Sequence, residues 1–326
     1  MTGFSQCQLH PQKADVDALN WIFVIDTLNF CFWTAGGNNK WEVTWQGKTY
    51  TGYFALCAAI NRAIDEGYSI TNPTTYGRIS IKDLKYILRG DNESYSCPLI
   101  KERLDCLHQV GLVLQEQFDG KFLNVIKACE NSAVKLLNIV VDNFKCYKDE
   151  AVYNGKKVAI YKRAQILIGD IWACFKGKEY GCFKDIEELT MFADYRVPQV
   201  LIHFGAMEYT DNLMERLKKG EKNGFKSLKA ELFELKFNVF MFADEILKNG
   251  SEEEVEIRGC SIHAVELVVQ EVKRQLPEVK SSPSKDDENA VVCNSILIDH
   301  FLWDYRRQHA EELEHIPFHK TLSIYY

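Results

Sequence analysis

Two stretches of the sequence place carboxylates among aromatic side chains. Asp194 lies in 191–205, and Asp299 and Asp304 lie in the strongly apolar stretch 294–309. A carboxylate can stabilise or attack a developing cation, and a carboxyl group with a raised pKa can donate a proton to a leaving group. The two stretches therefore predict nucleophilic or acid–base chemistry, provided that the fold brings them together.

Each stretch also has a purely structural interpretation. Asp194 precedes a helix that starts near Pro198, so its carboxylate can cap the free amides of the first turn. In a helical 294–309, His300 and Asp304 lie one turn apart, and with Asp299 they can form the polar stripe of a surface helix. The sequence leaves these interpretations open beside the chemical ones.

The segment after Asp194 is similar to a known catalytic segment. A short helix, a turn and the pattern Asp-x-x-Val-x-x-Val-Leu (194–201) resemble the part of helix-hairpin-helix DNA glycosylases that bears their catalytic aspartate. This similarity suggests cleavage of an N-glycosidic bond. A carboxylate near the anomeric carbon stabilises the oxocarbenium character that the sugar acquires in that reaction.

Composition limits the class of protein. The 326 residues carry a net charge of −7, which argues against a duplex-binding protein, and we expect a monomer without a stable nucleic-acid partner. No apolar run reaches the ~18 residues of a membrane span, and residues 1–17 do not resemble a signal peptide, so we expect a cytoplasmic protein. The 11 cysteines include no CxxC pair, and we expect no metal or cofactor.

The hydrophobic pattern predicts a mainly helical protein that forms one domain over 1–326. A small β-hairpin is predicted over 41–53, where two alternating runs flank a Gln-Gly turn. Segment 278–289, rich in serine and charged residues, is predicted to be a flexible insert. Helical patterns cover 18–33, 54–66, 80–89, 98–118, 122–144, 161–175, 184–192, 198–205 and 294–309.

Motifs that run in order from about residue 18 to the last residue give a more specific resemblance. They are DTLNF followed by FW (26–33), GKTYTGY (47–53), LCAA (56–59), YKRAQIL (161–167), FADYR (192–196), EIRGCS (256–261), LWDY (302–305) and IYY (324–326). Together they resemble the queuosine salvage family, whose members are queuosine 5′-phosphate N-glycosylases (hydrolases). The resemblance implies a mainly helical fold similar to that of DNA glycosylases. It also implies hydrolysis of queuosine 5′-monophosphate to queuine and ribose 5-phosphate, without a metal.

The resemblance also implies roles for individual residues. By their place in the motifs, Asp304 is the nucleophile or transition-state stabiliser, and Phe192, Asp194 and Asp299 contact the base. His300 occupies a position where the family can have tyrosine. The region before residue 14 departs from the family pattern, in which a histidine contacts the base. The further substrate-binding candidates are His300, Tyr195 and, as the nearest N-terminal histidine, His10.

Two features of the implied substrate call for further contacts. A flat base can be held between aromatic rings, and Trp33 joins Phe192 as a candidate, although core packing also explains Trp33. A 5′-phosphate requires cationic donors, so a nucleoside without the phosphate is predicted to be a poorer substrate. The cationic candidates are Lys162, Arg163, Arg196 and Lys320.

Two other functions are compatible with a helical protein of this kind. A DNA or RNA base glycosylase is disfavoured by the acidic balance, by the lack of a GxGxxT hairpin before Asp194 and by the lack of an iron–sulfur cysteine set. A non-catalytic, tRNA-associated helical binding protein is disfavoured by the aromatic and acidic clusters at 192–196 and 299–305. The sequence does not show whether these two clusters converge.

Overall fold

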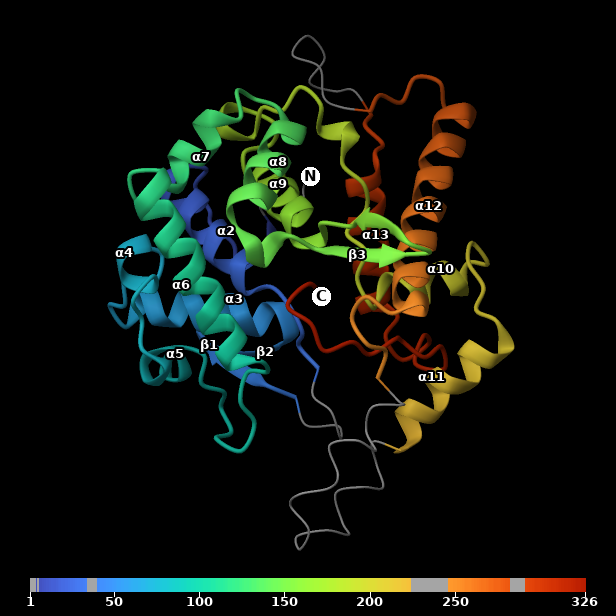
Figure 1. Ribbon diagram of the computed structural model, residues 1–326, viewed down its shortest axis with the longest axis horizontal. Coiled ribbons are helices and arrows are strands. Elements are labelled where there is room, and N and C mark those ends of the chain that lie inside the picture. Colours follow the sequence, from blue (N-terminus) through green and yellow to red (C-terminus); the bar gives the residue numbers. More distant parts are fainter. Residues whose placement is uncertain (1–3, 5, 34–39, 224–245, 282–290) are drawn as a thin grey trace, which may run out of the picture.

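Helices make up most of the structure, a computed structural model that describes residues 4, 6–33, 40–223, 246–281 and 291–326. Within these residues, no helix is both long and apolar enough to cross a membrane. The first group of helices comprises α2 (Val16–Leu28), α3 (Gly52–Asp65), α4 (Pro73–Tyr76), α5 (Ile81–Ile87), α6 (Ile100–Gln117), α7 (Phe122–Ala128), α8 (Ala133–Asn143) and α9 (Lys162–Cys174) (Figure 1).

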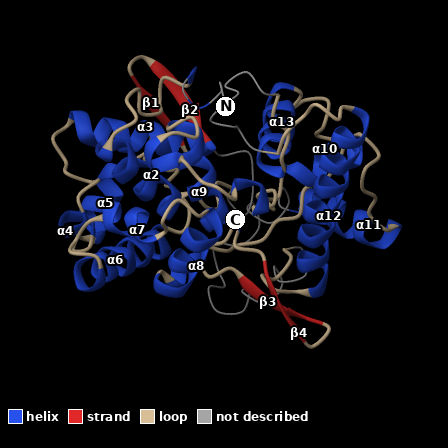
Figure 2. Ribbon diagram, turned by 90° about the horizontal axis from the view of Figure 1, so that it is seen from above, coloured by secondary structure: helices blue, strands red, loops and turns tan. Residues whose placement is uncertain are grey.

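A second group follows along the chain. It comprises α10 (Val197–His203), α11 (Asp211–Asn223), α12 (Glu252–Gln275) and α13 (Ser295–Gln308), and the single 3-10 turns are η1 (Lys145–Tyr147), η2 (Glu179–Gly181) and η3 (Ile186–Glu188). Figure 2 shows the first group on one side of the molecule and the second on the other, with the C-terminal end between them. The predicted mainly helical fold is confirmed.

The strands of the described residues form two small antiparallel hairpins. β1 (Glu42–Trp45) pairs with β2 (Lys48–Thr51) over the segment where the sequence predicts a hairpin, and that prediction is confirmed. β3 (Glu150–Tyr153) and β4 (Lys156–Ala159) form a second hairpin that the sequence analysis missed. Strand β4 ends at Ala159, shortly before α9 begins at Lys162.

Helix α2 is the centre of the first group. Its residues Ala18, Leu19 and 21–28 are all buried, as expected for a helix that neighbours enclose on every side. α3, α6, α7 and α9 pack around it. The helical pattern predicted over 18–33 is therefore a core helix, but the helix ends at Leu28 and the chain continues without helical structure.

Two buried arginines hold the carboxyl end of α2. Arg163 donates to the backbone carbonyls of Asp26 at 3.1 Å and Thr27 at 2.7 Å, and Arg103 donates to the carbonyl of Leu28. The last carbonyls of a helix lack intrahelical partners and carry partial negative charge. The two guanidinium groups donate hydrogen bonds to these carbonyls and offset their partial negative charge, which explains why the helix can end inside the core.

The predicted helix over 122–144 is wrong, because the structure divides it into α7 and α8. Glu130 and Asn131 between them adopt positive φ angles of 53° and 62°, which a right-handed helix cannot contain. Asp185 then caps α8, with its Oδ1 accepting a hydrogen bond from the amide of Ala133 at 2.6 Å. The apolar stripe continues across the break, so periodicity alone did not reveal it.

The predicted insert over 278–289 lies outside the described residues from position 282 onward. The described residues on its two sides meet, because the amide of Lys280 donates to the carbonyl of Val291 at 2.9 Å and the amide of Cys293 donates to the carbonyl of Lys280 at 2.8 Å. The described residues that flank this segment are therefore hydrogen-bonded to each other in the connection between α12 and α13.

Two buried carboxyl groups come from α2 and α9. Asp26 is fully buried, and its Oδ2 has no hydrogen-bond partner among the described residues, while Asp170 is 7% exposed. Burial raises the pKa of Asp170 to about 7, and burial together with the charge of Asp170 raises the pKa of Asp26. Near neutral pH, the folded protein therefore holds protons that the unfolded chain releases.

We expect Asp170→Asn to stabilise the protein at pH 8 and to change its stability little at pH 5. The pKa of this group is raised on folding, so the wild-type free energy of unfolding falls as pH rises from 3.8 through about 7. The penalty above that range is on the order of a few kcal/mol, and a neutral amide avoids it. Denaturant unfolding at both pH values measures the difference. The exposed Asp105→Asn is the control, and an equal change at pH 5 and pH 8 for Asp170→Asn would contradict the prediction.

Candidate active site

The irregular segment that carries Phe192 and Asp194 is held by side chains from three helices. Because these tertiary contacts take the place of helical hydrogen bonds, the short helix predicted over 184–192 is wrong apart from the single turn η3. The amide of Thr190 donates to Gln165 Oε1 of α9 at 2.8 Å. The amide of Phe192 donates to Asp299 Oδ1 of α13 at 3.1 Å. Arg258 Nε of α12 donates to the carbonyl of Ala193 at 3.1 Å.

Arg258 is itself fixed by a buried ionic network. Its guanidinium pairs with Asp149 at 2.5 Å and with Glu254 at 3.1 Å, and the side chain is 1% exposed. The ring of Tyr326 lies 4.5 Å from the guanidinium, and its hydroxyl donates to Glu254. Buried charges are tolerated only where they are paired in this way. The network fixes the backbone carbonyl between the two candidate residues Phe192 and Asp194.

Asp194 caps α10, as the structural interpretation of its position predicts. Its Oδ1 accepts hydrogen bonds from the amides of Arg196 and Val197, each at 2.8 Å. No hydrogen bond to its second oxygen is found in the described part of the chain. Burial lowers the pKa of Lys162 and raises that of Asp299; the charge of Asp194 opposes the first shift and adds to the second, so the three groups are electrostatic neighbours. The cap fixes this carboxylate next to two buried titratable side chains.

Asp299 is a buried acid. It is 6% exposed, and burial raises its pKa well above the ordinary value of 3.8, with a further contribution from Asp194. The amide of Phe192 and the charge of Lys162 oppose the shift only in part. Asp299 therefore does not belong to an exposed polar stripe, and that interpretation of α13 is wrong for this residue. A carboxyl group in such surroundings retains its proton above its usual range.

Phe192 packs between α9 and α13. A Cβ atom at Gly169 of α9 would lie 2.7 Å from Phe192 Cζ, so only glycine allows the ring to approach the helix this closely. On the other side, the ring meets His300 edge-on, with centroids 6.0 Å apart and an interplanar angle of 82°. The structure thus brings Phe192 together with the residues of α13.

The N-terminal segment brings His10 to the same place. His10 Nε2 lies 3.0 Å from the hydroxyl of Tyr53, and its Nδ1 lies 3.1 Å from the carbonyl of Phe4. Burial lowers the pKa of both His10 and His300 to about 4, and the charge of His300 further lowers that of His10. Both imidazoles are therefore neutral at physiological pH and offer one donor and one acceptor each.

Asp304 lies at the exposed end of this group. It follows His300 by one turn of α13, and its carboxylate opposes the effect of burial on the pKa of His300. Asp304 is exposed, whereas Asp299 is buried. One helix therefore presents one carboxyl group inside the protein and one at its surface.

Sequence reasoning missed an aromatic group beside Asp304. The ring of Trp303 lies 5.7 Å from that of Phe54 and 6.3 Å from that of Tyr53. The Arg307 guanidinium covers two of these rings, at 4.2 Å from Phe54 and 4.8 Å from Trp303. Tyr53 and Trp303 both stand inside the motifs GKTYTGY and LWDY, and this was the available signal.

The described contacts of two predicted substrate-binding residues, Trp33 and Tyr195, are with other parts of the protein. Trp33 is buried, its Nε1 has no hydrogen-bond partner among the described residues, and no described contact joins it to the other candidates. Tyr195 packs on the C-terminal segment, with its ring 5.4 Å from Phe318 and 6.3 Å from Tyr326. Tyr195 therefore links Asp194 to the end of the chain.

The four cationic candidates separate into three environments. Arg163 is committed to backbone carbonyls at the end of α2, which makes it a structural residue and not a phosphate ligand. Lys162 is buried, which lowers its pKa to about 8 in spite of the opposing effect of Asp194. Arg196 and Lys320 flank one ring, that of Phe318, at 3.9 and 5.4 Å.

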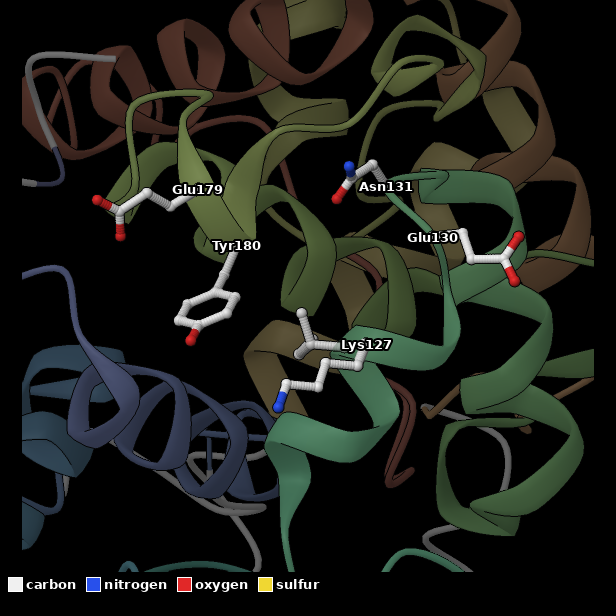
Figure 3. A pocket seen from close by; sticks show the side chains of 6 residues that line it. Lys127, Glu130, Asn131, Glu179 and Tyr180 are labelled. Atoms are coloured by element: carbon white, nitrogen blue, oxygen red, sulfur yellow. The ribbon is translucent and has the colours of Figure 1, made fainter.

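A separate surface pocket of about 520 Å³ lies between the end of α7 and η2. Figure 3 shows Lys127 and Tyr180 extending toward it from its two sides. None of the candidate residues lines it, so it is distinct from the site built around α13. Its lining residues are Ile126, Lys127, Glu130, Asn131, Glu179 and Tyr180.

Comparison with known proteins assigns the chain to a family. The family model described as queuosine salvage protein matches residues 9–236 and 233–326. This chain belongs to the queuosine salvage protein family. Relatives named queuosine 5′-phosphate N-glycosylase/hydrolase are 43% identical in Mus musculus, 40% in Nematostella vectensis and 35% in Sphaerobacter thermophilus. Each match covers 98% of this chain and 84 or 85% of the relative.

The match to the queuosine salvage family includes the whole candidate site. It begins at residue 9, before His10, and it continues through α13 to the last residue, Tyr326. Phe192 and Asp194 lie within its first matched range and Asp304 within its second. The residues that the structure brings together from distant parts of the chain are therefore all within family-matched sequence.

Proposed function

We propose that this protein is a queuosine 5′-phosphate N-glycosylase/hydrolase that converts queuosine 5′-monophosphate to queuine and ribose 5-phosphate. The observation that carries the proposal is the pairing on α13 of a buried acid with a raised pKa, Asp299, and an exposed carboxylate, Asp304. Cleavage of a glycosidic bond requires both an acid for the leaving group and a carboxylate for the sugar.

The base of this substrate needs a specific kind of assistance. Ordinary purines can accept a proton at N7, but a 7-deazaguanine has carbon at that position, so protonation must occur elsewhere on the base. Asp299, which retains its proton because it is buried, can donate to the base as the bond to the sugar breaks. Asp194, fixed by its cap, can accept hydrogen bonds from the guanine-like edge.

The sugar requires a negative charge close to its anomeric carbon. We assign this role to Asp304, either as electrostatic stabiliser of the oxocarbenium-like transition state or as nucleophile. Over the complete reaction, water adds a hydroxyl group to C1′, the C–N bond breaks, and the base leaves with the bonding electron pair and a proton. Neither route requires a metal ion or an organic cofactor.

Aromatic and imidazole groups complete the proposed base site. Phe192 offers a ring for stacking. His300, neutral because burial lowers its pKa to about 4, can donate and accept hydrogen bonds without adding charge. Both ring nitrogens of His10 are already within hydrogen-bond distance of Tyr53 and Phe4, so His10 would contribute its ring face to the base site. We further propose that the protein acts as a cytoplasmic monomer on the free nucleotide rather than on nucleic acid, in keeping with its net charge of −7.

The proposal is tested by incubating the protein with three substrates and separating any released base by chromatography. The substrates are queuosine 5′-monophosphate, queuosine and a queuosine-containing oligonucleotide. We expect release of queuine mainly from the nucleotide. Preferential release from the oligonucleotide would favour a nucleic-acid glycosylase, and no release from any of the three would favour a non-catalytic binding protein.

A further inference from the structure

Two arginines from distant parts of the chain converge on one side-chain oxygen. Gln199 Oε1 of α10 accepts a hydrogen bond from Arg306 Nε of α13 at 2.8 Å and another from Arg196 Nη1 at 3.3 Å. The Gln199 amide nitrogen is used as a donor to the carbonyls of Leu313, at 3.4 Å, and of Ile316. Gln199 is therefore held rigidly and acts as a neutral bridge between two like charges.

The buried member of this pair has unused donors. Arg306 is 8% exposed, and in the described part of the chain no hydrogen bond and no ion pair is found for its terminal nitrogens. Five N–H donors in a fixed fork suit a planar or tetrahedral oxyanion, and only Nε is occupied here. The Arg196 guanidinium lies 3.9 Å above the ring of Phe318, which fixes its direction as well.

The charges around Arg306 and Arg196 favour the binding of an anion by the two guanidinium groups. Burial lowers the pKa of Arg306 to about 10, and the charge of Arg196 lowers it further, while Glu314 and Asp194 oppose the shift. The Asp194 carboxylate is engaged by two amides, and Glu314 is exposed. Two guanidinium groups held together without a carboxylate between them are electrostatically costly, and a bound dianion removes this cost.

The pair also lies where the substrate requires a phosphate site. Arg306 follows Asp299 by seven residues, or two turns, on the same buried face of α13. Arg196 follows Asp194 by two residues. Arg306 therefore shares a helix face with the proposed acid Asp299, and Arg196 follows the proposed base contact Asp194 closely along the chain.

We propose that Arg306 and Arg196, bridged by Gln199, form the subsite that binds the 5′-phosphate and makes the enzyme selective for nucleotides over nucleosides. The inference rests on the proposed function. Arg306 was not among the cations indicated by the sequence. Lys162 is less suited to this role, because it is buried and its charge is already offset by the neighbouring Asp194.

The test compares the kcat/KM for queuosine 5′-monophosphate with that for queuosine in wild type, Arg306→Gln and Arg196→Gln. Loss of one charge-assisted contact is expected to lower the nucleotide value by on the order of 10- to 100-fold. The nucleoside value should change less than about threefold, so the ratio of the two values falls in the variants. Arg306→Lys should recover part of the ratio. The control is Arg89→Gln, which removes an arginine paired with Glu66 elsewhere on the protein.

A second measurement does not depend on catalysis. Inorganic phosphate should raise the melting temperature of the wild type and of Arg89→Gln but not that of Arg306→Gln. If both substrates lose efficiency equally in Arg306→Gln, or if phosphate still stabilises that variant, the phosphate subsite is refuted and Arg306 is only structural. If the wild type releases no base from the nucleotide but phosphate stabilises it through Arg306, the proposed function fails while the anion site stands.

Discussion

Replacement of Asp304 by Asn is expected to lower kcat for release of queuine from queuosine 5′-monophosphate by on the order of 10³-fold. The amide has nearly the same shape as the carboxylate, but it provides neither negative charge for the oxocarbenium-like sugar nor a nucleophile. Because Asp304 is exposed and has no hydrogen bond among the described residues, its replacement should not disturb the fold. KM should change by no more than a few-fold, because the interaction matters mainly in the transition state.

Steady-state kinetics with thermal melting as a check on folding would measure this effect. Glu311→Gln is a matched control, because it removes another exposed carboxylate from the segment just beyond α13. If Asp304→Asn retained near-complete turnover, Asp304 could not be the group that acts at the sugar, and the assignment would pass to Asp194.

Asp299→Asn is expected to lower kcat by on the order of 10²-fold, because the amide cannot transfer a proton to the departing base. In the wild type only the protonated acid is active, so kcat should fall as pH rises through the raised pKa of Asp299. The variant should lack this decline and should be slow at all pH values. Its stability at neutral pH should be equal to or greater than that of the wild type, because an uncharged amide replaces a buried acid.

Asp194→Asn provides the matched comparison. It removes charge from a carboxylate that accepts two amide hydrogen bonds at the start of α10, so a loss of stability on the order of 1 kcal/mol is expected there and not in Asp299→Asn. The pH profile of kcat and thermal melting distinguish the two variants. An unchanged pH profile in Asp299→Asn would exclude Asp299 as the acid.

Local patterns were sufficient for most helices and for the β1–β2 hairpin. The apolar spacing of α13 and the polar residues within it follow from near neighbours in the sequence. So does the capping role of Asp194, which depends on amides two and three residues further along the chain. Prediction failed over 122–144 and 184–192, where Asp185, Gln165 and Arg258 make long-range contacts that override the local pattern.

The sequence by itself therefore determined the helical class, the motifs and the chemical nature of the candidate side chains. Only the tertiary structure decided which of these side chains are buried and which charges lie close together. Asp299 becomes an acid because residues more than 100 positions away bury it. Arg163 and Arg306 have different roles because Arg163 donates to the carbonyls of α2, whereas Arg306 shares the side-chain oxygen of Gln199 with Arg196. Burial and charge proximity arise from segments that are distant along the chain, and periodicity, which reports only near neighbours, carries no information about them.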